Sequence, residues 1–215
     1  MKPIRMTIII ALITLAVLGS GCSMKVWRYN FKSLSADLDD WYHNFGTYRL
    51  DSSGLCLDER YINTPYYFIG DITITLNFEL HVSESAPASI EIGLSDNIFW
   101  GGSNETWLGL YQLGLPVAES WRIGDYSSST GQNTHDHAGV IAELNHNGDN
   151  VVVFSRVGNV ISIIFNGTDM GDFPLEKFAA SNCFPTLSAA GDFGTLIITR
   201  VKVDYTEKSE KWPVV

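Results

Sequence analysis

The pattern of hydrophobic and polar positions predicts β-strands along most of this chain. In "DITITLNFEL", residues 71–80, apolar and polar side chains alternate strictly, and "SIEIGLS", residues 89–95, repeats the pattern. A period of two is typical of a strand with one buried and one solvated face, whereas a helix would spread these apolar residues around its axis. Further strands are predicted at "TWLGLYQL", "AGVIAEL", "NVVVFSR", "NVISIIFN" and "GTLIITRVKVDY", the last with Ile197, Thr199, Val201, Val203 and Tyr205 on one face.

Short turn signals separate these strands. Gly or Asn pairs occur at Gly101-Gly102, Asn147-Gly148, Gly158-Asn159 and Asn166-Gly167. Both residue types tolerate the positive φ that tight hairpins require. Many antiparallel strands, almost no helix and one core predict an all-β fold, an antiparallel β-sandwich or jelly roll.

The first 21 residues have the features of an export signal. Lys2 and Arg5 precede "MTIIIALITLAVL", an apolar run that is short for a membrane span. The following "LGSGCS" resembles the lipobox of bacterial lipoproteins, in which cleavage leaves an N-terminal cysteine, here Cys22, that is then acylated. The family prefers leucine where this chain has Gly19. A plain secretory signal that is cleaved nearby is the alternative.

The lipoprotein resemblance implies a membrane partner and a location. Several acyl chains would anchor the protein stably, and Ser23 after the cysteine is similar to the pattern that sorts lipoproteins to the outer membrane of the bacterial cell envelope. We therefore divide the chain into a signal peptide (1–21), a lipidated N-terminus and tether (22–40), the sandwich (41–206) and a C-terminal tail (207–215). In the tether, "FKSLSADLDDW" is either a short helix or simply a linker.

Composition and charge narrow the class of partner. With 215 residues, 45% of them hydrophobic, the chain suits one globular domain after the targeting segment. Its formal net charge of −10 argues against nucleic acid, which needs a basic patch to replace its counterions. The same charge does not argue against cations or neutral polymers as ligands.

Two cysteines remain after Cys22. In an oxidising envelope, the pair Cys56 and Cys183 is predicted to form a disulfide. Two buried free thiols are the alternative. Neither residue lies in a motif that would activate a catalytic thiol.

One hairpin and its surroundings resemble a known superfamily. "VVVFSRVGNVISIIFNG", the later "LIITRVKVDY" and the opening "FGTYRLDSSGLCLDE" are similar to the concanavalin A-like lectin/glucanase superfamily, in particular its laminin G-like branch. The resemblance covers about residues 42–205. It implies a concanavalin A-like sandwich and a lectin-like protein that binds a glycan or polysaccharide.

Catalysis is less well supported by the residues. The β-glucan-cleaving members of this superfamily carry three acidic residues on one strand, and the nearest match here offers Glu91 and Asp96 with Gly93 in the middle position. Asp96 also falls on the other face of the strand. We therefore expect a binding protein rather than an enzyme, with a hydrolase related to 3-keto-disaccharide hydrolases as the alternative. A structural or adhesive surface module is the second alternative.

Aromatic residues near Gly- and Ser-rich loops are the candidate ligand-binding groups. Flat rings can stack on sugar rings while neighbouring polar groups bind the hydroxyls. Alternatively, the rings fill the ends of the core. The rings in or beside these loops are those of Trp100, Trp107, Tyr111, Trp121 and Tyr126, and of these we take Trp100, Trp107, Trp121 and Tyr126 as the ligand-binding candidates.

Two groups of residues are candidates for metal binding. His135 and His137 alternate and could bind zinc with a third ligand, although histidines in such a polar loop are usually solvated. Calcium, which the lectin resemblance implies near the rim of the sandwich, could use the oxygens of Asp169 and Asp172. No run of residues has EF-hand spacing.

Overall fold

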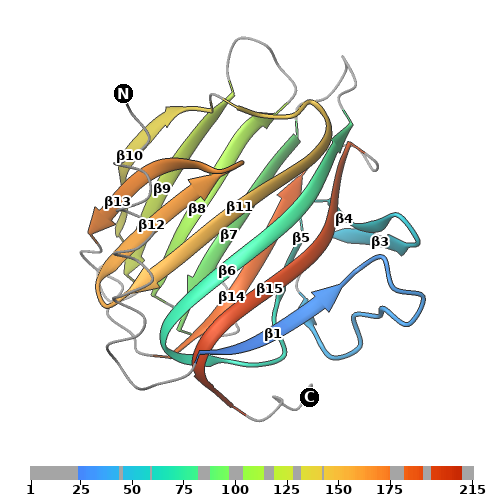
Figure 1. The fold of residues 1–215 in the computed structure, drawn as a ribbon, viewed down its shortest axis with the longest axis horizontal. Helices are drawn as coiled ribbons and strands as arrows, with labels where there is room; N and C mark the ends of the chain where they lie inside the picture. Colours follow the sequence, from blue (N-terminus) through green and yellow to red (C-terminus); the bar gives the residue numbers. More distant parts are fainter. Residues whose placement is uncertain are drawn as a thin grey trace, which may run out of the picture.

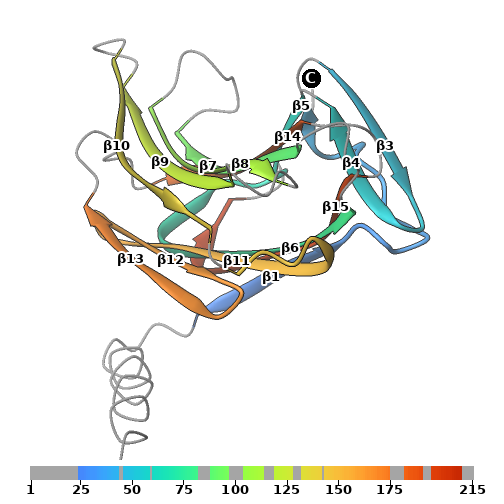
Figure 2. The same ribbon diagram turned by 90° about the horizontal axis from the view of Figure 1, so that it is seen from above.

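Two antiparallel β-sheets, packed face to face, form the body of the molecule (Figures 1 and 2). This computed structural model describes residues 24–43, 46–58, 60–81, 88–96, 104–113, 119–127, 132–141, 143–174, 182–190 and 195–209. Within these residues every regular element is a strand. The predicted all-β antiparallel sandwich is therefore confirmed.

The first sheet contains the long strands that the alternation predicted. Its order is β13 (Thr168–Pro174), β12 (Val160–Phe165), β11 (Asn147–Val157), β6 (Phe68–His81), β15 (Leu196–Lys208) and β1 (Lys25–Asn30). A hairpin of β3 (Thr47–Asp51) and β4 (Gly54–Asp58) joins this sheet through the pairing of Leu55 with Ile198.

The second sheet covers the first and curves. Its order is β10 (Gln132–Val140), β9 (Ser120–Ser127), β8 (Glu105–Leu113), β7 (Ala88–Ser95), β14 (Asn182–Ala190), β5 (Arg60–Asn63) and β2 (Tyr42–His43). Strand β14 links the layers, because Cys183 pairs with β6 whereas Phe184 and the residues after it pair with β7. In Figure 2 the second sheet bends away from the first at both of its sides, so that its outer face is concave.

The core lies between the two layers. The apolar residues of β6 from Ile72 to Leu80 are fully buried, as are Ile90 and Leu94 of β7. Their polar neighbours in the sequence face outward, as the alternation predicted. Burying these side chains supplies the main driving force for packing one sheet on the other.

A β-bulge in β15 corrects the predicted face of that strand. The register shifts between Ile198 and Arg200, so Ile198 pairs with Phe78 whereas Val201 pairs with Leu76. One extra residue reverses which side chains point inward. The prediction that Ile197 and Thr199 share a face with Val201, Val203 and Tyr205 is therefore wrong, and Leu196 and Ile198 take their places on that face.

The sandwich begins earlier than predicted. Residues 25–30, assigned to the tether, form β1, which pairs along its whole length with β15. Trp27 of β1 packs against Trp41, with 5.7 Å between ring centroids, and Phe31 is fully buried. The segment between them forms turns rather than a helix. At the other end, β15 extends to Lys208, two residues past the predicted boundary at 206.

Strand β10 also differs from the prediction. The sequence placed a strand at 138–144, but β10 runs from Gln132 to Val140. The backbone amide of Ile141 still bonds Glu119, at 3.4 Å, and the chain then turns into the segment before β11. Strand β9, the partner of β10, begins at Ser120, opposite Val140, so the pairing of the two strands ends there.

Cys56 and Cys183 do not form the predicted disulfide. Both are free thiols, and both are buried. The Sγ of Cys56 accepts a hydrogen bond from Arg49 Nη2 at 3.4 Å. Cys183 lies on another strand, opposite Phe68. Burial raises the pKa of the Cys183 thiol to about 12, and nearby Arg156 opposes this rise only in part. The alternative of two buried thiols is the one that the structure contains.

The export signal and Cys22 lie outside the described residues. In the part of the chain that the structure describes, no helix has the length and apolar character needed to cross a bilayer. Signal cleavage and lipidation at Cys22 stay predictions.

Candidate functional site

The concave outer face of the second sheet carries polar and aromatic side chains on a floor of glycines. Register aligns Gly93, Trp107 and Gly124 across β7, β8 and β9, and the next row contains Glu91, Gly109 and Arg122. Because side chains alternate along a strand, Glu105 and Tyr111 of β8 share this outer face. Their neighbours Leu108 and Leu110 are fully buried in the core.

Trp107 lies against the sheet because position 124 has no side chain. A Cβ added to Gly124 would lie 2.2 Å from Cζ2 of Trp107. The indole is only 8% exposed. Trp107 therefore forms part of the floor of the concave face, on the outer side of the second sheet rather than at an end of the core.

Tyr111 uses the next glycine in the same way. Its ring extends back over Gly109, and its hydroxyl donates a hydrogen bond to Glu91 Oε1 at 2.6 Å. The guanidinium of Arg122 lies 5.7 Å from the centroid of the Tyr111 ring. Burial and the bond to Glu91 raise the pKa of Tyr111 well above its usual range. The hydroxyl thus stays protonated and acts as a donor.

A second phenol of this face, that of Tyr61, lies close enough to two carboxylates for them to affect its pKa. Burial, Glu105 and Glu91, in that order, raise the pKa of Tyr61 to about 12. Tyr61 projects from β5, in the same row as Glu91. Glu105 is only 5% exposed. The face therefore brings together carboxylate acceptors, phenol donors and one guanidinium, which can bind hydroxyl groups of a ligand.

The four predicted ligand-binding aromatics do not form one cluster. Trp107 and Tyr126 share the concave face, where Tyr126 lies opposite Glu105 in the register. Trp121 is on the same strand as Tyr126 but at an odd offset, so it faces the other side, toward the first sheet. Trp100 lies outside the described residues.

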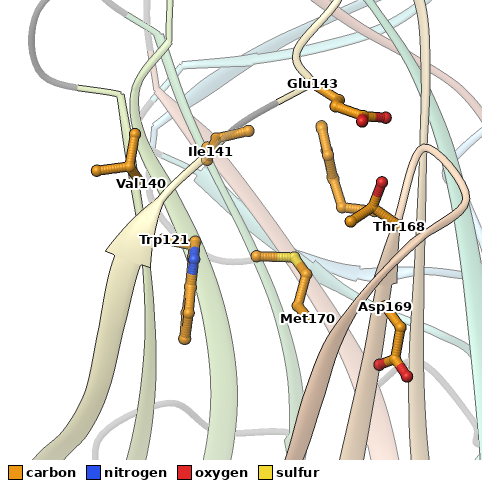
Figure 3. Close-up of a pocket in the computed structure, with 8 residues that line it drawn as sticks. Trp121, Val140, Ile141, Glu143, Thr168, Asp169 and Met170 are labelled. Atoms are coloured by element: carbon orange, nitrogen blue, oxygen red, sulfur yellow. The ribbon is translucent and has the colours of Figure 1, made fainter.

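Trp121 instead lines a pocket at the open edge of the sandwich, where β9 and β10 meet β12 and β13 (Figure 3). The pocket holds about 190 Å³. Figure 3 shows Met170 pointing toward Trp121, with Val140 and Ile141 on one side and Glu143, Thr168 and Asp169 on the other. Asp169, a predicted calcium ligand, thus belongs to the same pocket as a predicted sugar-stacking ring.

The metal candidates have other partners in the structure. Asp169 Oδ1 accepts a bond from the Gly171 amide at 2.9 Å, and Asp172 accepts one from the Ser162 hydroxyl. The ring of His137 packs on Phe173, with 4.9 Å between centroids, whereas the side chain of His135 lies outside the described part. Among the described residues, no three His, Cys, Asp or Glu side chains come together as a metal site would require. The described residues therefore provide no set of ligands for zinc or calcium.

The sequence did not predict that Glu91 interacts with Tyr111 and Tyr61, which lie on other strands. Asp96, weighed as its partner, instead binds the backbone amide and the side chain of Asn104 at 2.8 and 2.7 Å and so ties the ends of β7 and β8 together. Tyr111 was among the aromatic residues noted near the loops, and Glu105 could have been found from the alternation of "ETWLGLYQL", which sends both residues to one face. Arg122 and Tyr61 reach that face only through the strand register.

No protein-family model and no curated protein sequence matches this chain. Solved structures do match. The carbohydrate recognition domain of Emp47p has a TM-score of 0.66 at 8% identity and covers 88% of this chain and 100% of that one. The potassium-bound carbohydrate recognition domain of Emp46p has a TM-score of 0.64 at 14% identity, with coverage of 81% and 94%. The apo Crh5 transglycosylase has a TM-score of 0.62 at 13% identity, with coverage of 89% and 88%.

These likenesses show the fold, which is a concanavalin A-like jelly roll of the kind found in lectins and glycosidases. At such low identities they carry no residue roles, because one fold serves many functions. The laminin G-like branch stays a prediction.

Proposed function

We propose that this chain is a carbohydrate-binding protein whose ligand occupies the concave outer face of the second sheet. The observation that carries the proposal is the bond between the Tyr111 hydroxyl and Glu91, beside Arg122 and above the glycine floor. Such a group is ordered before the ligand arrives, so less conformational entropy is lost on binding. The fold of the chain, shared with carbohydrate recognition domains, supports the same class of ligand.

The chemistry of the face suits hydroxyl-rich ligands. The partly exposed Glu91 can accept hydrogen bonds from sugar hydroxyls, and the exposed Arg122 can donate them. The half-buried ring of Tyr126 offers an apolar face for a sugar ring. The rings of Trp107 and Tyr111 cover Gly124 and Gly109, so a flat ligand would lie on these rings rather than on the backbone of the glycines.

A glycan-array and polysaccharide screen tests the proposal, run with and without calcium. The informative variant is Glu91→Gln, which keeps the shape but removes the charged acceptor; Glu207→Gln, on an exposed part of β15, is the matched control. We expect binding to weaken about tenfold in Glu91→Gln, the loss typical of a charged hydrogen bond, and to stay unchanged in the control. Failure of the folded protein to bind any glycan would refute the proposal and favour an adhesive or structural surface module.

A hydrolase or transglycosylase is the second candidate. The supporting observation is that Glu91 and Glu105 share one face and both raise the pKa of Tyr61. Two carboxyl groups on one cleft are the machinery of most glycosidases. Release of nitrophenol from aryl glycosides, lost in both Glu91→Gln and Glu105→Gln, would support this function; no turnover in the unmodified protein would refute it for those substrates.

We also propose that the chain is attached to the outer membrane of a bacterial envelope through lipid on Cys22. The apolar segment before Cys22 and its placement support this. Metabolic labelling with palmitate should mark the chain and should fail in Cys22→Ser. A secreted, unlabelled product from the unmodified chain would instead favour the plain signal peptide.

A further inference from the structure

The pocket at the open edge of the sandwich lies apart from the concave face. Its lining comes from the inner side of β9, the end of β10 and the segment after it, the last residue of β12 and the first residues of β13. None of the residues that build the concave floor contributes to it. The lining residues are Trp121, Val140, Ile141, Glu143, Phe165, Thr168, Asp169 and Met170.

The apolar wall of this pocket is held in place by its neighbours. Trp121 lies against Gly139, where an added Cβ would be 2.6 Å from the indole Nε1, and its ring meets Phe173 edge-on at 5.6 Å between centroids. Phe165 and Ile141 are buried, with 2% and 6% of their surfaces exposed. A wall that is fixed before binding favours one ligand shape.

The size of the pocket suits one ring. Its volume of about 190 Å³ somewhat exceeds the roughly 150 Å³ of an apolar cavity that accepts benzene. Trp121 and the Met170 thioether are both good partners for a ring face or edge.

The polar side of the pocket is acidic. Among the described residues that line it, the charged ones are Glu143 and Asp169, and both are exposed. The backbone of Glu143 is fixed by a bond from Asn166 Nδ2 to its carbonyl oxygen, at 2.6 Å. With a formal net charge of −10 on the whole chain, an anionic ligand would be repelled.

We propose that this pocket is a second ligand site, separate from the carbohydrate face, that takes a compact apolar ring bearing a protonated amine. The ring lies against Trp121 and Met170. The ammonium group lies on the polar side of the pocket, opposite Val140, where Figure 3 shows Thr168 between the carboxylates of Glu143 and Asp169. Thr168 can accept a further hydrogen bond from the ammonium group.

Three probes of similar size test this assignment on the folded full chain: 2-phenylethylamine, 2-phenylethanol and 3-phenylpropanoate. The readout is the NMR signal of the Trp121 indole N–H, identified by its loss in Trp121→Phe. We expect this signal to shift with the amine and the alcohol, with the tightest binding for the amine and the weakest for the carboxylate. No shift with any probe, or equal binding of amine and carboxylate, would overturn the proposal.

Two variants locate the site and its charge preference. Thr168→Trp fills the pocket from an exposed position and should abolish amine binding, whereas Thr47→Trp, on the distant β3, should not. Glu143→Gln combined with Asp169→Asn should weaken amine binding about threefold, as expected for exposed ion pairs, and leave the alcohol unchanged. The control for that charge change is Asp39→Asn with Glu207→Gln. Undiminished amine binding in Thr168→Trp would refute the site even if glycan binding succeeds, because no variant here alters the concave face.

Discussion

The side-chain amide of Asn166 is hydrogen bonded to that of the fully buried Asn150, with 2.9 Å between Nδ2 and Oδ1. Asn150 Nδ2 in turn donates to the carbonyl oxygens of Asn145 and Gly148, at 2.9 and 3.1 Å. Asn166 has a positive φ of 45°, as its place in an Asn-Gly turn predicts. This pair of amides therefore ties the β12–β13 turn to the segment that precedes β11.

Replacing Asn150 by alanine should destabilise the fold. The change leaves the Asn145 amide and the Asn166 side chain without the shared acceptor that the buried Asn150 provides, which costs about 2 kcal/mol. We expect the free energy of unfolding in urea to fall by this amount. Asn147→Ala, on an exposed neighbouring residue, should change it by less than about 0.5 kcal/mol. Equal losses in both variants would contradict the role given to the buried amide.

Gly124→Ala should disturb Trp107. The new methyl group would meet the indole at 2.2 Å, so the ring must move from its packed position. We expect a loss of stability of about 1–3 kcal/mol, a changed near-ultraviolet circular dichroism spectrum and weaker glycan binding. Gly93→Ala, whose added carbon would have its nearest contacts at 3.4–3.7 Å, is the control on the same face. An unchanged spectrum in Gly124→Ala would show that the ring does not lie there.

Stability should decline above about pH 9, in part because of Cys183. Burial raises the pKa of its thiol from 9.0 to about 12, so between these values the unfolded chain loses a proton that the folded chain keeps. The stabilising contribution is thus complete below pH 9 and is lost as the pH rises toward 12. The slope of unfolding free energy against pH over this window should be shallower in Cys183→Ala. Parallel slopes would contradict the assignment.

The concave face should prefer neutral polysaccharides to anionic ones. Glu91 and Glu105 lie on it, and the chain has a formal net charge of −10. A sulfated or uronic polymer would have to approach these carboxylates, at a cost that added salt reduces. We expect affinity for a neutral glucan to be nearly independent of salt. Tighter binding of the anionic polymer at low salt would point to Arg122 as the dominant contact.

The alternation of apolar and polar residues was enough to predict several strands, because in the structure these strands run without interruption and keep one face buried. The alternation of residues 71–80 became β6, and that of residues 89–95 became β7, each with the predicted face inward. Periodicity failed where it was interrupted, as at the bulge after Ile198. It also failed for β1, an edge strand with few buried side chains, whose pairing with β15 depends on a strand distant in the sequence.

The candidate sites show the same division. Tyr126 and Trp107 could be nominated as aromatic residues, but whether they share a face depends on how β8 and β9 align. Trp121 faces the other side of the sheet because it lies an odd number of residues from Tyr126 on β9, and the meeting of two sheet edges places Asp169 in the same pocket as Trp121. Contacts between residues so far apart in the sequence leave no local signal.

By itself, the sequence determined the class of fold, the face of most long strands and the positive-φ turn at Asn166, because alternation and glycine or asparagine chemistry act over a few residues. Only the tertiary structure decided that Cys56 and Cys183 stay apart, that Glu91 meets Tyr111, and that Trp121 faces an acidic pocket. These outcomes depend on strand order and register, which are set by the packing of the whole core rather than by any single segment.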